Sequence, residues 1–442
     1  MDLERSPLLT DLYELTMLQS YYEYGMEQQA VFEFFIRPSQ SRSFFIAAGL
    51  AQALDWLEHA RFGAEELEWL AASGHFSDAF VERLRGWRFT GEVRALPEGT
   101  VFFPEEPLLQ VFAPLPEAQL VESRLMNILH FQTLIATKAA RCVHAAEGRL
   151  VVDFGLRRAH GGEAGLWAAR ACYLAGFGAT ATTLAGARYD IPVTGTMAHS
   201  FILAHDDETE AFERFARSHP DNVVLLIDTF DVIEGARKVV DLAARLARDN
   251  IRVKGVRIDS GDLAANARAV RDVLDAGGLT DTLVLLSGGL DEFRIADIVG
   301  TGAPADGFGV GSKVNTSADE PFLDSAYKLH HFSGRARAKH ARGKSDLPGV
   351  KQIFRQHDAH GILALDTIGL DGDDEPGHAL LETVMRDGQR LESASVATDL
   401  GGARTRAADE LNRLPAACRR LTAPETVPVR LSDALGTLQR AT

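Results

Sequence analysis

Short apolar runs alternate with amphipathic stretches along residues 151–314. Runs such as 223–227 and 283–286 are too short for helices and are apolar on both faces, which is typical of strands in a parallel sheet buried on both sides. Between the runs, apolar residues recur with helical spacing, which predicts helices over residues 164–177, 234–249, 263–276 and 291–299. Alternating strands and helices predict a parallel sheet or an α/β barrel.

Before this region the pattern is different. Residues 91–113 follow a strand, turn, strand, turn, strand pattern, which predicts a small β domain separate from the barrel. A long helical stretch over 118–146 could cross between the two domains, and we expect its His130 to be a satisfied buried histidine, because no second ligand stands at metal spacing. The remaining predicted elements are a strand at 31–37, helices at 47–61, 64–72, 77–85 and 403–411, and strands at 362–365 and 379–384.

Polar and charged residues in the N-terminal and C-terminal thirds of the chain lead to further predictions. Thr10 is predicted to cap a first helix whose first turn contains Asp11 and Glu14, and Tyr13 is expected in the core, with a ligand contact as the alternative. Residues 366–374 are predicted to form an acidic turn. The basic run 335–355 is either a solvated loop or a phosphate-attracting lip over the site, and the sequence leaves both open.

Composition restricts the class of protein. A chain of 442 residues is expected to form two or three domains, and its 46% hydrophobic and 24% charged residues are typical of a globular protein. The net charge of −16 argues against general nucleic-acid binding. Three widely spaced cysteines fit a reducing cytoplasm, and we expect neither a signal peptide nor a membrane span.

Polar or glycine-rich segments follow the predicted strands, and in a barrel these segments gather on the rim where active sites lie. Arginines and exposed glycine amides suit phosphate oxygens, whereas carboxylates suit Mg²⁺ and sugar hydroxyls. The sequence therefore predicts a phosphorylated sugar substrate with a metal. The segments are 153–158, 194–200, 227–231, 256–262, 287–289 and 307–312.

The segment 257–262 is the most informative of these. A helix cap would account for Ser260 or Asp262. It does not account for Arg257, a charge at a buried strand end that needs an anionic partner, so we favour a functional role for Arg257 and Asp259.

Glycine turns follow the next two predicted strands. Gly288, Gly289, Gly311 and the adjacent Ser312 could belong to simple tight turns. Successive turns on the last strands of a barrel, however, commonly bind a phosphate group.

The other candidates have several possible roles. His199, three residues after Thr196, could be a base, a phosphate ligand or a phosphate acceptor. Asp228 could bind Mg²⁺ or cap a helix. Phe154, close to Arg157, makes sense if a flat heterocycle stacks there, which points to glycosyl transfer to a ring nitrogen.

These residues carry a resemblance to a known family. The segments 153–161, 195–200 and 256–262, together with 8–13 and 348–352, resemble those of nicotinate phosphoribosyltransferase, a type II phosphoribosyltransferase. The resemblance implies an incomplete TIM-like α/β barrel plus a smaller α+β domain built from the N- and C-terminal segments. The expected boundaries are 1–120 for the N-terminal α+β domain, 121–330 for the barrel, and 331–442 for a C-terminal segment packed back on the N-terminal domain.

The resemblance also implies the reaction. Nicotinate and phosphoribosyl pyrophosphate would give nicotinate mononucleotide and pyrophosphate in NAD salvage, with Mg²⁺ and coupled hydrolysis of ATP. It further implies a cytoplasmic homodimer with shared active sites. The implied roles are a phosphohistidine at His199, nicotinate contacts at Tyr13 (from the partner subunit), Phe154, Thr196 and Arg257, phosphate binding by Arg157, ribose binding by Asp259, and a cradle for the 5-phosphate at Gly288, Gly289, Gly311 and Ser312.

The choice between nicotinate and nicotinamide depends on Thr182. Nicotinamide-using relatives have an aspartate near the second barrel strand, and Thr182 aligns there. A hydroxyl does not repel the nicotinate carboxylate, so we predict nicotinate. The alternatives are a nicotinamide phosphoribosyltransferase, a quinolinate phosphoribosyltransferase, which would need extra cations and no ATP, and a non-catalytic sensor of phosphoribosyl pyrophosphate or pyridine nucleotides. The joint presence of Arg157, His199, Asp228 and Asp259 argues against the sensor.

Overall fold

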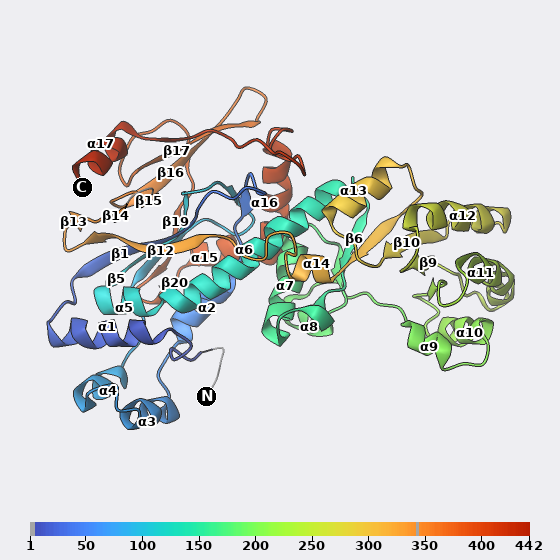
Figure 1. The fold of residues 1–442 in the computed structure, drawn as a ribbon, viewed down its shortest axis with the longest axis horizontal. Helices are drawn as coiled ribbons and strands as arrows, with labels where there is room; N and C mark the ends of the chain where they lie inside the picture. The colour runs from blue at the N-terminus through green and yellow to red at the C-terminus, as the bar shows by residue number, and fades with distance from the viewer. Residues whose placement is uncertain (1–4, 342–343) are drawn as a thin grey trace. The chain divides into compact units, whose positions relative to one another are not determined.

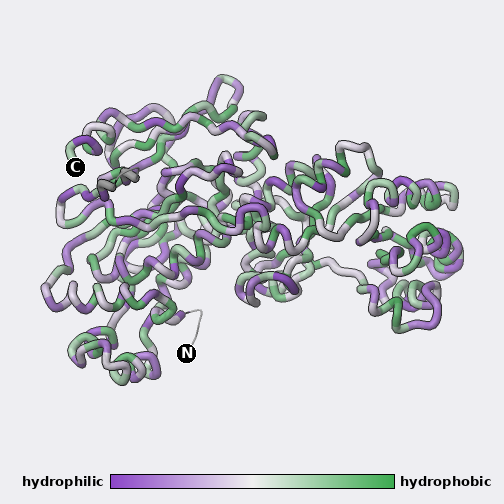
Figure 2. Tube along the Cα trace, in the orientation of Figure 1, coloured by the Kyte–Doolittle hydropathy of each residue, from purple (hydrophilic) through white to green (hydrophobic). Residues whose placement is uncertain are grey.

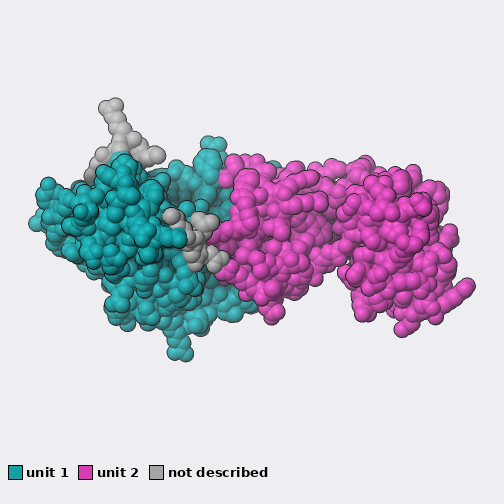
Figure 3. Space-filling view, turned by 90° about the horizontal axis from the view of Figure 1, so that it is seen from below, with its two compact units in different colours: residues 1–137, 322–442 teal, residues 138–321 magenta. Residues whose placement is uncertain are grey.

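The computed structural model describes residues 5–341 and 344–442. It forms two compact units, Met1–Thr137 with Phe322–Thr442, and Lys138–Pro321 (Figure 3). These boundaries lie at 137/138 and 321/322, where the sequence suggested 120/121 and 330/331. The unit made from the two terminal segments contains more of the chain than the unit between them.

The unit Lys138–Pro321 contains an open sheet of six parallel strands in the order β7-β6-β11-β10-β9-β8 (Figure 1). Its strands are β6 (Leu150–Asp153), β7 (Ala179–Thr180), β8 (Val224–Leu226), β9 (Gly255–Ile258), β10 (Leu283–Ser287) and β11 (Gly307–Val310). The helices between and after them are α7 (Gly162–Leu174), α8 (Thr183–Tyr189), α9 (His199–Leu203), α10 (Glu208–Ser218), α11 (Val232–Leu246), α12 (Leu263–Ala276), α13 (Glu292–Gly300) and α14 (Ser312–Asn315).

The predicted helical spacing is confirmed in this unit. Helix α12 has the predicted bounds, and α7, α11 and α13 overlap the other three predicted helices. Apolar and polar positions alternate along α11 and α12 (Figure 2), and the buried positions recur every three or four residues, as an amphipathic helix requires. The side chains of Asp231, Asp262 and Asp291 accept backbone hydrogen bonds at the starts of α11, α12 and α13, which fixes where these helices begin.

The terminal segments share a seven-stranded sheet in the order β13-β12-β1-β5-β3-β19-β20. Its strands are β1 (Gln29–Ile36), β3 (Glu92–Ala95), β5 (Pro107–Pro114), β12 (Ser325–Phe332), β13 (Arg335–Ala336), β19 (Glu382–Arg386) and β20 (Gln389–Arg390). A four-stranded sheet contains β18 (His378–Ala379), β16 (Lys351–His357), β17 (Leu363–Leu370) and β21 (Val429–Leu431), and two short pairs contain β2 (Phe45–Ile46) with β4 (Val101–Phe102) and β14 (His340–Ala341) with β15 (Lys344–Ser345).

The helices of this unit are mostly short. They are α1 (Leu12–Glu23), α2 (Leu50–His59), α3 (Ala64–Ala72), α4 (Asp78–Leu84), α5 (Leu115–Leu120), α15 (Glu392–Thr398), α16 (Leu400–Arg413) and α17 (Asp433–Ala441), and the long α6 (Glu122–Ala145) contains the unit boundary. His130 on α6 accepts the Leu323 amide at 2.9 Å, as expected of a satisfied histidine. No described helix combines the length and apolar character needed to span a bilayer.

Several expectations for the terminal segments are wrong. Helix α1 is preceded by Asp11 as N-cap, and the Thr10 hydroxyl has no hydrogen-bond partner among the described residues. Tyr13 is 47% exposed rather than in the core. Strand β4 pairs with β2, so the three strands predicted within 91–113 do not form a domain by themselves.

The acidic turn and the basic run are corrected together. Asp366 lies inside β17 and receives a hydrogen bond from the buried Arg355 at 3.0 Å, so the predicted turn at 366–374 is strand over its first five residues. Lys351 is also buried, with Glu33 at 2.7 Å. The C-terminal end of the basic run is therefore internal structure and not a lip, whereas Arg342 and the side chain of Lys344 lie outside the described residues.

A buried carboxyl on α1 predicts a pH-dependent stability. Glu14 accepts a hydrogen bond from Gln119 at 2.7 Å, and burial raises its pKa from the ordinary 4.5 to about 7 despite that bond. The folded state therefore holds this proton more tightly than the unfolded state, so the contribution to stability is complete below pH 4.5 and is lost as the pH rises through about 7. We expect the Tm of the wild type to fall more than that of Glu14→Gln between pH 5 and pH 8, as followed by circular dichroism. Glu68→Gln, at an exposed position of α3, should retain the wild-type slope, and identical slopes for all three proteins would contradict the prediction.

Candidate active site

A cavity of about 300 Å³ lies where the parallel strands of the Lys138–Pro321 unit end. Because all six strands run in the same direction, the residues that follow them meet at one edge of the sheet. The cavity is lined by Phe154, Arg157, Arg158, Asp259, Ser287, Gly288, Gly289, Leu290, Gly309, Gly311, Ser312 and Lys313. Seven of the thirteen residues predicted for the site are in this set.

Phe154 is placed by glycines on the neighbouring strand. Its backbone amide donates to the Val310 carbonyl at 2.7 Å, which continues the pairing of β6 with β11. A Cβ atom added to Gly309 would lie 2.3 Å from the Phe154 ring, and one added to Gly311 would lie 2.9 Å from the Phe154 carbonyl oxygen. The ring can lie over β11 only because Gly309 has no side chain, and Gly311, directly after β11, leaves room for the Phe154 backbone.

A buried hydrogen-bond network holds the turn that carries Phe154 and Arg157. The Asp153 carboxylate accepts from the Gly155 amide at 2.9 Å, from Asn315 at 2.9 Å and from Thr180 at 2.7 Å. Burial raises the pKa of Asp153, and these three hydrogen bonds oppose the rise. The network joins the ends of β6 and β7 to α14, which limits movement of the cavity wall.

Asp228 and Asp259 are brought together at the ends of β8 and β9. One Asp228 oxygen accepts from the Asp259 amide at 2.8 Å and from the Ser260 hydroxyl at 2.6 Å. Asp259 in turn accepts from the Ser287 hydroxyl at 2.5 Å. The other oxygen of Asp228, Oδ1, is buried and has no hydrogen-bond partner among the described residues, so it is available to a ligand.

The unpartnered Oδ1 of Asp228 is the one feature of the site that suggests a metal ligand. The described residues contain no group of three or more His, Cys, Asp or Glu side chains that could hold a metal by themselves. Mg²⁺ in phosphate-binding sites usually takes one or two carboxylates and completes its shell with water and substrate phosphates. Asp228 Oδ1 fits that limited role.

Arg257 links β9 to the segment before α9. Its guanidinium donates to the Thr196 hydroxyl and to the Met197 carbonyl, both at 2.9 Å, and lies 5.8 Å from the centre of the Phe154 ring. Burial lowers the pKa of Arg257, while the nearby carboxylates of Asp259 and Asp228 oppose this. The expected anionic partner is therefore absent as a direct contact among the described residues, and the buried Nε is left without an acceptor.

Six predicted residues lie outside the cavity lining: Asp228, Arg257 and Thr196, described above, and His199, Thr182 and Tyr13. His199 is the first residue of α9, and its Nδ1 lies 3.0 Å from the Thr229 hydroxyl. Thr229 directly follows Asp228 in the chain. Thr182 follows β7, and its hydroxyl is buried without a partner among the described residues. Tyr13 belongs to the other unit, where its hydroxyl lies 3.4 Å from Glu122.

Some lining residues carried too weak a signal to be predicted. Arg158 donates to Ser312 at 3.2 Å, and Lys313 pairs with Asp291 at 2.7 Å. Ser287 belongs to the predicted strand-end segment 287–289, but its part in the site, a hydrogen bond to Asp259, is visible only in the structure. A scan for basic or hydroxyl residues directly after each predicted strand would have included all three.

Comparison with known proteins identifies related chains. Three family models match in order: the nicotinate phosphoribosyltransferase N-terminal domain over residues 8–130, the nicotinate phosphoribosyltransferase family over 150–345, and the C-terminal domain over 377–439. A nicotinate phosphoribosyltransferase of Mycobacterium tuberculosis is 47% identical over 428 residues, which cover 96% of this chain and 91% of that protein. One from Bacillus subtilis is 41% identical and covers 79% of this chain and 72% of that protein.

Solved structures agree with these matches. The crystal structure of human nicotinic acid phosphoribosyltransferase superposes with a TM-score of 0.87 at 29% identity, covering 98% of this chain and 99% of that one. A nicotinate-nucleotide pyrophosphorylase from Pyrococcus furiosus shares the fold, with a TM-score of 0.74 at 23% identity over 92% and 95% of the two chains. The incomplete TIM-like barrel with an additional α+β domain is thus confirmed.

Proposed function

Since the chain belongs to the nicotinate phosphoribosyltransferase family, we propose that it transfers the phosphoribosyl group of phosphoribosyl pyrophosphate to the ring nitrogen of nicotinate. The products are nicotinate mononucleotide and pyrophosphate, and the reaction belongs to NAD salvage. The observation that carries the proposal is a single cavity with an aromatic ring on one wall and arginines and glycine turns on the others. Such a cavity suits a flat heterocycle next to a phosphorylated sugar.

The nicotinate ring stacks on Phe154, and its carboxylate faces Arg257. The unused Nε of Arg257 and the unpartnered hydroxyl of Thr182 are both donors that a carboxylate can satisfy. Neither position carries the negative charge that would reject nicotinate. This donor set favours nicotinate over nicotinamide.

The sugar phosphate occupies the other side of the cavity. Gly288 has φ +96°, and a Cβ there would lie 1.9 Å from the Asp259 carbonyl, so this turn is restricted to glycine and exposes its backbone to the ligand. Together with Gly289, Gly311 and Ser312 it forms the cradle for the 5-phosphate, while Arg157 supplies charge. Asp259, held by Ser287, accepts from the ribose hydroxyls.

Catalysis requires no general base, because the nitrogen of nicotinate already has a lone pair. The protein must instead position that nitrogen against C1′ and favour departure of pyrophosphate. Asp228 Oδ1 would hold Mg²⁺, which neutralises the charge of the leaving pyrophosphate when it is bound. The nearby Asp259 and Asp228 carboxylates also favour a cationic ribose in the transition state.

The family resemblance further supports coupling to ATP through His199 and a cytoplasmic homodimer in which Tyr13 serves the partner's site. The exposed Tyr13 is available for such a role. The three cysteines are buried and free, which is compatible with a reducing compartment.

Turnover of labelled nicotinate with phosphoribosyl pyrophosphate, with and without ATP, tests the proposal. We expect nicotinate mononucleotide to form, with kcat/KM for nicotinate above that for nicotinamide, and no product from quinolinate. A higher kcat/KM with nicotinamide would overturn the substrate choice. Binding of phosphoribosyl pyrophosphate with no turnover of any pyridine would favour the sensor.

The His199→Asn variant tests the coupling. Asparagine cannot accept phosphate as an imidazole does but retains hydrogen-bonding capacity toward Thr229. We expect the stimulation by ATP to disappear and incorporation of label from γ-labelled ATP to fall to background, while uncoupled transfer continues at a reduced rate. His205→Asn is the matched control, because His205 lies just after α9, the helix that His199 begins, and its Nδ1 contacts the carbonyl of Phe201. Labelling of the His199→Asn protein at the wild-type level would show that another residue is phosphorylated.

A further inference from the structure

Lys313 is a cation of the cavity wall that the family resemblance did not indicate. It lies directly after Ser312 and lines the cavity together with Arg157 and Arg158. The lining thus contains three cationic side chains and one carboxylate, Asp259. In a chain with a net charge of −16, this local excess of positive charge is where an anion can be held.

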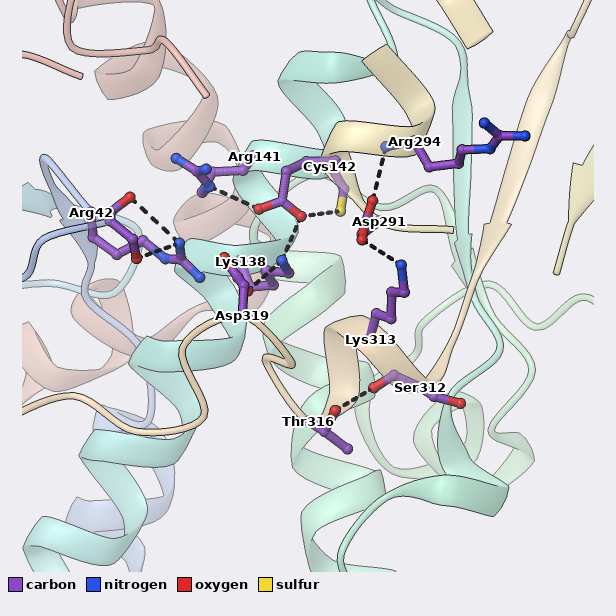
Figure 4. A network of polar contacts seen from close by, with 12 residues as sticks. Arg42, Lys138, Arg141, Cys142, Asp291, Arg294, Ser312, Lys313, Thr316 and Asp319 are labelled. Atoms are coloured by element: carbon purple, nitrogen blue, oxygen red, sulfur yellow. Dashed lines mark hydrogen bonds and ion pairs between the residues drawn. The ribbon is translucent and has the colours of Figure 1, made fainter. Parts of the chain in front are cut away.

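The position of Lys313 is set by Asp291. Its Nζ lies 2.7 Å from one Asp291 oxygen, and the other oxygen of Asp291 accepts the Arg294 amide at 2.8 Å (Figure 4). Burial would raise the pKa of Asp291, but the hydrogen bonds from Lys313 and Arg294 hold it below its ordinary value. Asp291 is the one acceptor of the Lys313 ammonium among the described residues. An ammonium has three N–H bonds, so two remain for a ligand.

The support behind Asp291 is buried. Its neighbour Glu292 is fully buried and is paired with Lys138 at 2.5 Å and with Arg141 at 3.0 Å, both on α6. Lys138 is also paired with Asp319 at 2.6 Å. The start of α13 is therefore anchored to α6, and Asp291 presents Lys313 from a fixed point.

We propose that Lys313 is a further substrate-binding residue, which donates to the phosphate group of the sugar phosphate, and that Asp291 is its positioning residue. The inference rests on the proposed function, because that function supplies the phosphorylated sugar. Phosphoribosyl pyrophosphate has two groups that could accept a hydrogen bond from Lys313: the 5-phosphate and the pyrophosphate. Lys313 directly follows the Gly311-Ser312 turn and faces the same cavity as Gly288 and Gly289, which favours the 5-phosphate.

Calorimetric titration of Lys313→Ala with ribose 5-phosphate, and separately with inorganic pyrophosphate, distinguishes the two sources. We expect the Kd for ribose 5-phosphate to rise about 10-fold or more, as for loss of one charge-assisted hydrogen bond, and the Kd for pyrophosphate to change little. Lys238→Ala is the matched control, because Lys238 lies in the same unit with similar exposure and is paired with Glu208 at 2.9 Å, outside the cavity lining. Its Kd for both ligands should equal that of the wild type.

A double variant separates contact from charge balance. Lys313→Ala alone leaves the Asp291 charge uncompensated near the cavity, and that charge would repel any phosphate. In Lys313→Ala/Asp291→Asn this charge is absent, and asparagine still caps α13. We expect the double variant to remain about 10-fold or more weaker than the wild type for ribose 5-phosphate.

Recovery of wild-type affinity in the double variant would overturn the inference, because Lys313 would then only neutralise Asp291. Equal weakening of ribose 5-phosphate and pyrophosphate would also overturn it, as would an unchanged Kd in Lys313→Ala. These binding readouts do not depend on turnover. A wild type that binds ribose 5-phosphate through Lys313 but turns over no pyridine would overturn the proposed function alone, whereas a wild type that binds neither ligand would overturn both.

Discussion

Replacing Gly309 by alanine should lower kcat/KM for nicotinate by about 100-fold, because the added methyl group would lie 2.3 Å from the Phe154 ring. The ring must move by about an ångström or more to relieve this contact, and it then no longer stacks correctly on the pyridine. Steady-state kinetics should show the loss mainly in the KM for nicotinate, with the KM for phosphoribosyl pyrophosphate less affected, since the cradle for the phosphate is formed by other residues.

Gly307→Ala is the control for that experiment. Gly307 lies two residues earlier on β11, so its added methyl group would point to the same face of the sheet, but it would lie 3.1 Å from Leu150 and away from the cavity lining. We expect near-wild-type kinetics and a modest loss of stability. If the two variants show the same kinetic loss, strand distortion rather than the position of Phe154 is responsible.

Arg257→Gln should reduce kcat/KM for nicotinate by about 100-fold or more, because a partly buried charged donor to the substrate carboxylate is removed. The same change removes the bonds to Thr196 and Met197, so the segment leading to His199 loses its link to β9. We expect kcat/KM for nicotinamide, which carries no charge, to fall much less. The ratio of the two specificity constants, measured at one pH, therefore reports the carboxylate contact itself.

Arg271→Gln provides the comparison for this second variant. Like Arg257, Arg271 donates two hydrogen bonds to loop residues, in its case to the carbonyls of Thr282 and Leu279, but it does not line the cavity. Its substitution should leave the ratio for nicotinate and nicotinamide unchanged. If kcat/KM for nicotinate and kcat/KM for nicotinamide fall equally in Arg257→Gln, the arginine supports the structure of the site and does not bind the carboxylate.

Much of the barrel unit follows from local pattern. The buried strands and amphipathic helices of residues 151–314 depend on periodicity, and their aspartate caps stand in the sequence directly before the helices. Because parallel strands end at one edge, the order of the strand-end segments was sufficient to place Phe154, Arg157 and Asp259 around one cavity.

The errors have a common physical cause, which is a partner distant in sequence. Asp366 looked like a turn residue because its neighbours are acidic and glycine-rich, and only its pairing with the buried Arg355 reveals a strand. Lys313 is absent from the predicted site for the same reason, since its contact with Asp291, 22 residues earlier, is not visible in the sequence. Burial of charge depends on such pairs, and a single sequence does not show which residues are paired.

The chain order of the two units has a consequence for synthesis on the ribosome. The unit Lys138–Pro321 is continuous in sequence, so it can fold as soon as it leaves the ribosome. Strands β1 and β3, in contrast, pair with β12 and β19, which are synthesised only after residue 321. Until then two strands of the seven-stranded sheet expose unpaired backbone groups, which are sites of aggregation. Nascent chains that stall within the barrel segment should therefore depend on chaperones more than released, full-length protein does.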